Sequence, residues 1–111
     1  MPFVFDAQRL TVALQAHGYT VERGAEGDPH VVHGRRRDGA EIWIDAGGRL
    51  RYQARRQTGV GQTRRVAQAG MDYRVLAEPY ALVTITVELA ATAQLADALA
   101  ALDDLAREGA D

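Results

Sequence analysis

The sequence HVVHGRRRDGAEIWIDAGGRLRYQAR, residues 30–55, decides the fold, because two turn signals separate stretches of alternating apolar and polar residues. The first signal, Asp38-Gly39, is typical of a two-residue hairpin loop, since both central residues of a type I′ turn have positive φ. This loop pairs Arg36 with Glu41 across the hairpin. One face of the hairpin then forms its core side, and this face carries Val31, His33, Ile42 and Ile44.

The second turn, Ala46-Gly47-Gly48, is predicted by testing both possible loop lengths against the apolar pattern. A two-residue loop would place Ile44 opposite Arg51 and mix apolar with charged residues on one face. A three-residue loop places Ile44 opposite Leu50 and keeps that face apolar, so we expect the three-residue register. Trp43 and Arg51 then become neighbours on the opposite face.

A helix is expected at each end of the chain. Asp6 has the position of a helix N-cap, and Gly18 supplies the left-handed residue that ends a helix of about three turns. The second helix is expected to begin after Thr92 and to end at Gly109. Apolar residues spaced three and four apart give this last helix a buried face, formed by Leu95, Ala98, Leu99, Leu102, Leu105 and Ala106.

Further strands are predicted from alternating residues at 19–23, 71–77 and 81–89. Residues 62–69 fit a short helix or irregular structure, and the pattern does not decide between the two. Strands joined by short turns, with helices confined to the ends, are typical of the α+β class. We therefore expect a single domain over residues 1–111, in which a mostly antiparallel sheet of about five to six strands carries the N- and C-terminal helices packed on one face.

Composition places the chain among globular proteins, because its 47% hydrophobic and 25% charged residues are close to the average of folded domains. It has no cysteine, no apolar run long enough to cross a bilayer and no N-terminal export signal, so a cytoplasmic location is expected. All 13 basic residues are arginine in a chain rich in alanine and glycine, a pattern typical of a GC-rich bacterial genome.

The charges are segregated along the chain, although their total is only −2. Residues 1–34 carry a net charge of −2, residues 35–74 carry +6 and residues 75–111 carry −6. Because the basic middle and the acidic end are complementary, we expect them to neutralise each other within one molecule or between two molecules.

The outward face of the central strands is the most distinctive surface that the sequence predicts. An aromatic side chain among arginines can form cation–π contacts or stack on a nucleic-acid base. The alternative is an ordinary solvated face, in which Trp43 covers the backbone of Gly34 and Arg36 pairs with Glu41. The candidate binding face consists of Arg36, Trp43, Arg49, Arg51 and Arg55.

A second candidate site is a glycine-containing connector flanked by arginines, which has the composition of an anion-binding loop. It lacks the lysine and the strand-to-helix context of a nucleotide-binding loop, so a plain connector is the alternative interpretation. The residues of this candidate anion loop are Arg56, Gly59, Gly61, Arg64 and Arg65.

The sequence gives little evidence for a catalytic or metal site. The chain contains no serine and no cysteine, so the two commonest nucleophiles are missing. His30 and His33 are three residues apart on a predicted strand and therefore point to opposite faces. Asp103 and Asp104 are adjacent on the last helix and are interpreted as a solvated face. No catalytic residue, metal site or cofactor is expected.

We therefore expect a small non-enzymatic module for protein interaction or oligomerisation, with a second copy or another protein as its partner and no membrane contact. The partly open sheet face around Trp43 supplies the surface. The alternative is a weak nucleic-acid or anion binder that uses the arginine-rich face. The net charge of −2 argues against this alternative, since nucleic-acid-binding domains are usually basic.

Overall fold

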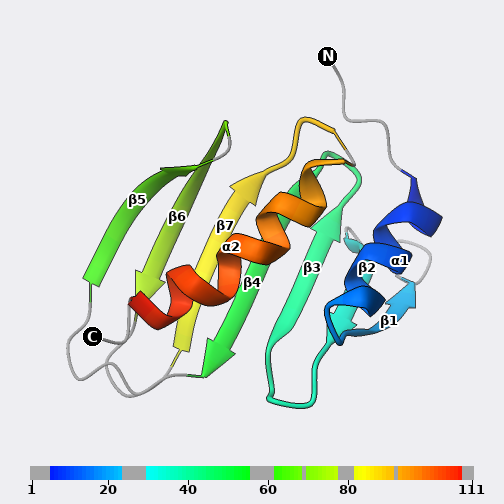
Figure 1. Ribbon diagram of the computed structural model, residues 1–111, viewed down its shortest axis with the longest axis horizontal. Helices are drawn as coiled ribbons and strands as arrows, with labels where there is room; N and C mark the ends of the chain where they lie inside the picture. The colour runs from blue at the N-terminus through cyan, green and yellow to red at the C-terminus, as the bar shows by residue number, and fades with distance from the viewer. Residues whose placement is uncertain are drawn as a thin grey trace.

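The computed structural model describes residues 6–23, 30–55, 62–68, 70–77, 82–91 and 93–108, which form one antiparallel sheet with two helices on the same side (Figure 1). The helices are α1 (Ala7–Ala16) and α2 (Gln94–Glu108). The strands are β1 (Thr20–Arg23), β2 (His30–Arg35), β3 (Glu41–Asp45), β4 (Arg49–Arg55), β5 (Gln62–Gln68), β6 (Met71–Ala77) and β7 (Leu82–Glu88). The α+β class and the helices on one face are confirmed, while the seven strands in the described residues exceed the five to six expected.

The strands follow the order β1-β2-β3-β4-β7-β6-β5 across the sheet. The first four form a meander in which each strand pairs with the next. The chain then builds the hairpin β5–β6 and returns with β7, which pairs with β4 from Arg49 opposite Glu88 to Arg55 opposite Leu82. β4 and β7 are therefore central strands, and β1 and β5 are the two edges.

The first helix has the predicted cap residues. The Asp6 carboxylate accepts a hydrogen bond of 3.1 Å from the Arg9 backbone N–H, which satisfies one of the free amides of the first turn. Gly18 has a φ of 88°, and the Tyr19 N–H donates to the Leu14 carbonyl at 3.1 Å. A left-handed glycine with such a hydrogen bond is a common helix C-cap.

The hydrophobic core lies between the sheet and the two helices. Every second residue of the central strands is buried there, since side chains alternate across a strand. α1 contributes Leu10 and Leu14. The predicted cap residues of the last helix, Thr92 and Gly109, lie outside the described residues. α2 buries the apolar face that the sequence predicts, formed by Leu95, Ala98, Leu99, Leu102, Leu105 and Ala106.

The first hairpin turn differs from the prediction. It is a three-residue loop, in which the Arg36 backbone N–H donates to the Ala40 carbonyl at 2.9 Å and Gly39 has a φ of 93°. A type I turn followed by one left-handed glycine closes a hairpin of this length. The predicted two-residue loop and the pairing of Arg36 with Glu41 are therefore wrong, and Arg35 lies opposite Glu41 instead.

This shift by one residue exchanges the two faces of β2, because side chains alternate along a strand. Gly34 lies on the core face, where an added Cβ would come within 3.0 Å of the Ile42 side chain and 3.3 Å of Tyr19. His33, which was predicted on the core face, points to the opposite side and lies opposite Trp43. The predicted core side chain of Val31 lies outside the part of the structure that is described.

The second turn has the predicted three-residue register. Ile44 lies opposite Leu50 and Trp43 lies opposite Arg51. Gly48, with a φ of 87°, ends the loop in the left-handed conformation. The β2–β3 and β3–β4 turns are therefore of the same kind.

Residues 62–68 form the strand β5, so the prediction of a short helix or irregular structure is wrong for this stretch. The turn at Gly70, with a φ of 75°, brings Gln68 opposite Met71 and starts the pairing with β6. β5 has a polar sequence because an edge strand has only one neighbour and charged side chains there discourage further pairing.

Candidate binding surface on the uncovered face of the sheet

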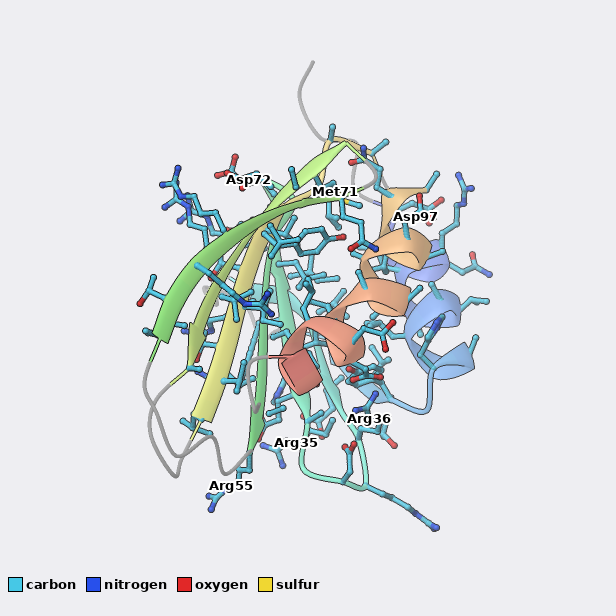
Figure 2. All side chains as sticks on the ribbon, turned by 60° about the vertical axis from the view of Figure 1, so that its left-hand side comes forward. Arg35, Arg36, Arg55, Met71, Asp72 and Asp97 are labelled. Atoms are coloured by element: carbon cyan, nitrogen blue, oxygen red, sulfur yellow. The ribbon has the colours of Figure 1, made fainter. Side chains whose placement is uncertain are left out.

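Both helices lie on one side of the sheet, and none of the described residues covers the other side. Figure 2 shows Arg36 and Asp97 on the helical side and Asp72 on the side away from the helices. We call this second side the uncovered face. Alternation along each strand directs every second side chain to it.

A row of side chains crosses the uncovered face from one edge of the sheet to the other. Each strand contributes one residue, and the strand pairings place these residues directly opposite one another. Directly opposite residues have Cβ atoms roughly 4.5–5.5 Å apart, which is within reach of their side chains. We call this set the central row, and in strand order it consists of Glu22, His33, Trp43, Arg51, Thr86, Arg74 and Arg65.

Three members of the central row form a stack. The rings of His33 and Trp43 are parallel within 8°, with centroids 5.0 Å apart. On the other side of the indole, the guanidinium carbon of Arg51 lies 4.5 Å from the ring centroid, a cation–π geometry. The His33 Nε2 atom lies 2.9 Å from a Glu41 carboxylate oxygen and is held there. Both ring faces of the half-buried Trp43 are therefore occupied, so a further ring would join the stack at one of its ends, beyond His33 or beyond Arg51.

The other half of the central row is basic. Among the residues that the structure describes, no carboxylate lies within 4.0 Å of the guanidinium nitrogens of Arg51, Arg74 or Arg65. Arg65 and Arg74 lie directly opposite each other on β5 and β6. Like charges in opposite positions destabilise a sheet, and an anion bound between them would remove this cost.

Acidic side chains beside the central row are engaged in other contacts. Glu41 lies 3.9 Å from the Nε atom of Arg35. Asp45 accepts hydrogen bonds of 2.9 Å from backbone N–H groups of the turn that follows it. Glu88 pairs with Arg49 at 3.2 Å, although both side chains are exposed and such a pair contributes little stability. These acids flank the row and do not interrupt it.

Two adjoining hollows open on the uncovered face at Thr86. The smaller, of about 320 Å³, extends from Thr86 towards Arg51 and the other residues of β3 and β4. The larger, of about 410 Å³, extends towards Arg74 and Asp72 of β6. Thr86 and Arg49 border both hollows. Thr86 therefore lies where the two hollows adjoin, between Arg51 and Arg74 of the central row.

The structure brings four of the five predicted face residues together, but it places Arg36 elsewhere. The guanidinium of Arg36 donates to the carboxylate of Asp103 on α2, on the helical side (Figure 2). Its inclusion in the binding face was wrong because the three-residue loop shifts β2 by one residue, which turns Arg36 towards the core side. On the uncovered face lie Trp43, Arg49, Arg51 and Arg55.

Arg36 belongs to a polar cluster between α2 and the sheet that the sequence did not predict. It donates to both carboxylate oxygens of Asp103 at 2.9 Å, and the Tyr52 hydroxyl donates to the same carboxylate at 3.0 Å. Arg36 also pairs with Asp38 at 2.7 Å and lies over the ring of Tyr19, 5.2 Å from its centroid. We call these five residues the Asp103 cluster.

The contacts of the Asp103 cluster shift the pKa values of its members. Hydrogen bonds from Arg36 lower the pKa of Asp103 below its ordinary value in spite of partial burial, and the Tyr52 hydroxyl adds to this lowering. Burial raises the pKa of Tyr19 to about 12 and also raises the pKa of Tyr52. The interpretation of Asp103 as part of a solvated face is therefore wrong, since its carboxylate anchors α2 to the sheet.

The candidate anion loop is divided by the structure. Arg64 and Arg65 are consecutive residues of β5 and point to opposite faces. Arg64 donates to the Leu105 carbonyl at 3.0 Å on the helical side, whereas Arg65 is part of the central row. These two arginines therefore do not converge on one site. The remaining members lie outside the described residues, and these are Arg56, Gly59 and Gly61.

Four residues of the central row are in neither candidate site predicted from the sequence, namely Glu22, His33, Thr86 and Arg74. His33 was assigned to the wrong face by the two-residue loop, and a test of both loop lengths would have corrected this assignment. Thr86 and Arg74 join the row only because β7 lies between β4 and β6. The sequence offers no signal for that strand order.

The chain matches no protein-family model, no curated protein and no solved structure. Within the described residues, no three His, Asp or Glu side chains gather closely enough to hold a metal ion. Neither α1 nor α2 is long and apolar enough to cross a membrane. The functional assignment therefore depends on the geometry and charge of the uncovered face.

Proposed function

We propose that the protein is a non-enzymatic interaction module that binds a second copy of itself or another protein through the uncovered face. The stack of His33, Trp43 and Arg51, on a sheet face that no described residue covers, is the observation that carries this proposal. Tryptophan and arginine are enriched among the residues that contribute most to protein interfaces. A tryptophan that is already held between two neighbours loses little conformational entropy when a partner covers it.

The charge of the central row supports a second copy as the partner. The row begins with Glu22 on β1 and ends with Arg74 and Arg65 on β6 and β5. If two copies pack face to face around a two-fold axis parallel to the strands, the acidic end of each row lies over the basic end of the other. Two-fold dimers are the commonest assemblies of identical chains.

Trp43→Ala is expected to weaken association and to leave the fold intact, because Trp43 lies on the uncovered face and not in the core. Size-exclusion chromatography with light scattering, at low and high salt, measures this effect. The wild-type mass should rise above the 12.1 kDa of one chain as concentration increases, while the variant stays at the monomer mass. Val12→Ala is the matched control, since Val12 is a 59% exposed apolar residue of α1 on the helical side.

Two results would count against this use of the uncovered face. If Trp43→Ala associates as strongly as the wild type, the interface does not involve the stack. A wild-type chain that remains monomeric at every concentration and at both salt levels excludes a second copy as the partner.

A second candidate function, weak binding of single-stranded nucleic acid or another anion, is favoured by the position of the acidic helix. α2 packs on the core side through Leu95, Leu99 and Leu102, so its acids lie across the sheet from the arginines of the central row. Packed layers are separated by roughly 10 Å, and the Debye length at physiological salt is about 8 Å. The acids of α2 therefore cancel little of the positive field at the uncovered face.

A further inference from the structure

The central row contains a gap at Thr86. Neighbouring strands are about 4.8 Å apart, so the positions on either side of β7 are separated by roughly 10 Å. These positions hold Arg51 and Arg74, and the short Thr86 side chain lies between them. A flat ring with van der Waals contact on both faces needs roughly 7–8 Å. The strand spacing therefore leaves room for one planar group between side chains that stand perpendicular to the sheet at these two positions, and Thr86 borders both hollows there.

The wall of the gap on the β4 side is a stacking surface. The guanidinium carbon of Arg51 lies 4.5 Å from the centroid of the Trp43 ring on β3. On the other side of β4, Thr86 of β7 lies directly opposite Arg51. Guanidinium planes stack on unpaired bases much as aromatic rings do. A base above Thr86 would thus become the fourth layer after His33, Trp43 and Arg51.

The wall on the β6 side supplies positive charge. Arg74 and Arg65 lie opposite each other beyond the gap, with no ion-pair partner among the described residues. A phosphate group between them would receive charge-assisted hydrogen bonds and relieve their repulsion. Asp72 and Glu88 border the larger hollow and Asp45 borders the smaller one, so we expect the phosphates of a bound strand to follow the arginines of the central row.

We propose that the gap above Thr86 is a slot for one unpaired base of single-stranded nucleic acid, with the adjoining phosphate held by Arg74 and Arg65. This inference rests on the proposed use of the uncovered face as a binding surface and assigns a ligand class to its basic half. A paired base in a duplex cannot enter the slot, and a phosphoserine peptide would use the arginines but leave the slot empty, because its side chain has no planar ring. Single-stranded nucleic acid uses both parts.

The test is a titration with a short single-stranded oligonucleotide, followed by the fluorescence of Trp43, which is the only tryptophan in the chain. Thr86→Phe fills the slot without changing any charge, and it is expected to raise the Kd by roughly 5- to 150-fold, the range for losing one stacked base. Thr84→Phe is the matched control, because Thr84 points to the same face of β7 but lies beside Gln53 and Leu76, outside the central row. It should bind as the wild type does.

Further ligands and variants separate the possible failures. An abasic strand of equal length is expected to bind more weakly than the normal strand by a similar factor; equal binding would overturn the base slot. A phosphoserine peptide that binds as tightly as the oligonucleotide would overturn the ligand class. If Thr86→Phe does not fold, Thr86→Ile replaces it, and unchanged binding by the variant that folds contradicts the slot.

The inference can fail while the proposed function stands. No oligonucleotide binding at low salt, together with loss of association in Trp43→Ala, overturns the base slot and leaves the interaction module in place. If no oligonucleotide binds and Trp43→Ala associates as strongly as the wild type, both the base slot and the interaction module are overturned.

Discussion

Replacing Asp103 with alanine is expected to lower the free energy of unfolding by about 2–3 kcal/mol, the effect of removing one partner from a partly buried, charged hydrogen-bond cluster. The Asp103 carboxylate accepts two hydrogen bonds from Arg36 and one from Tyr52. Without it, the Arg36 guanidinium keeps Asp38 as an ion-pair partner and Tyr19 as a ring contact, although its side chain is only 15% exposed in the wild type. The buried Tyr52 hydroxyl also loses its acceptor.

Urea unfolding of the wild type and variants measures this loss. Asp104→Ala is the control, since Asp104 is exposed on the next residue of α2, and a surface change of this kind usually shifts stability by less than about 0.5 kcal/mol. Arg36→Ala and the double variant complete a cycle, in which the two losses should be clearly non-additive. Equal losses for Asp103→Ala and Asp104→Ala would show that the cluster does not anchor α2.

Because the pKa of Asp103 is lowered in the folded state, the stabilisation that this residue contributes depends on pH. A carboxyl whose pKa is lower in the folded than in the unfolded state stabilises the fold above the unfolded value, which is near 4. This stabilisation is lost as pH falls from about 4 through the depressed folded pKa. Asp103→Asn removes the titrating group, so its stability should fall less steeply than that of the wild type over this acidic range.

Arg65→Glu is expected to strengthen the fold and weaken anion binding at the same time. In the wild type, Arg65 and Arg74 lie directly opposite each other, and the substitution turns this like-charged pair into an opposite-charged pair. Stability should rise by about 0.5 kcal/mol, within the range for cross-strand pairs. The affinity for a single-stranded oligonucleotide should fall tenfold or more at low salt, and the dependence of log Kd on log salt should become shallower by about one unit.

Thermal unfolding and the oligonucleotide titration measure the two effects of Arg65→Glu separately. Arg55→Glu is the control, because Arg55 is exposed on the same face but outside the central row. It should weaken binding less than Arg65→Glu. If both variants weaken oligonucleotide binding equally, the strand is attracted by the overall positive charge of the uncovered face, and Arg74 and Arg65 do not form a specific site.

The Asp103 cluster and the uncovered face are connected through the position of α2. By anchoring the helix to the core side of β4, Asp103 keeps the acidic part of the chain away from Arg51 and the rest of the central row. The acids of α2 and the arginines of the central row thus lie on opposite sides of the sheet. Among the ion pairs formed by described residues, the basic middle and the acidic end meet twice, where Arg36 pairs with Asp103 on the helical side and where Arg49 pairs with Glu88 on the uncovered face.

The sequence predicted those parts of the fold that depend on local chemistry. The cap residue Asp6, the left-handed Gly18 and the apolar face of α2 are confirmed. The β2–β3 and β3–β4 turns show where prediction from local sequence succeeds and where it fails. At residues 46–48 the apolar pattern distinguishes the two loop lengths, and the predicted register is right. At Asp38-Gly39 the turn signal alone predicts a two-residue loop, and the register is wrong by one residue.

The candidate site was predicted only in part, because its remaining contacts join distant segments. The neighbours Trp43 and Arg51 followed from a short loop and were found together. Thr86 and Arg74 enter the same row through the order of β4, β7 and β6, which depends on long-range pairing. The anchoring role of Asp103 depends on how α2 crosses the sheet, and no local pattern encodes that crossing.

Acrylamide quenching of Trp43 fluorescence tests most directly whether the uncovered face is the binding surface. Trp43 is the only tryptophan in the chain, so the quenching constant reports the exposure of this face alone. We predict that the constant falls as protein concentration passes through the range in which light scattering shows association. A quenching constant that keeps its dilute value while the chains assemble would place the interface on another surface and contradict the account.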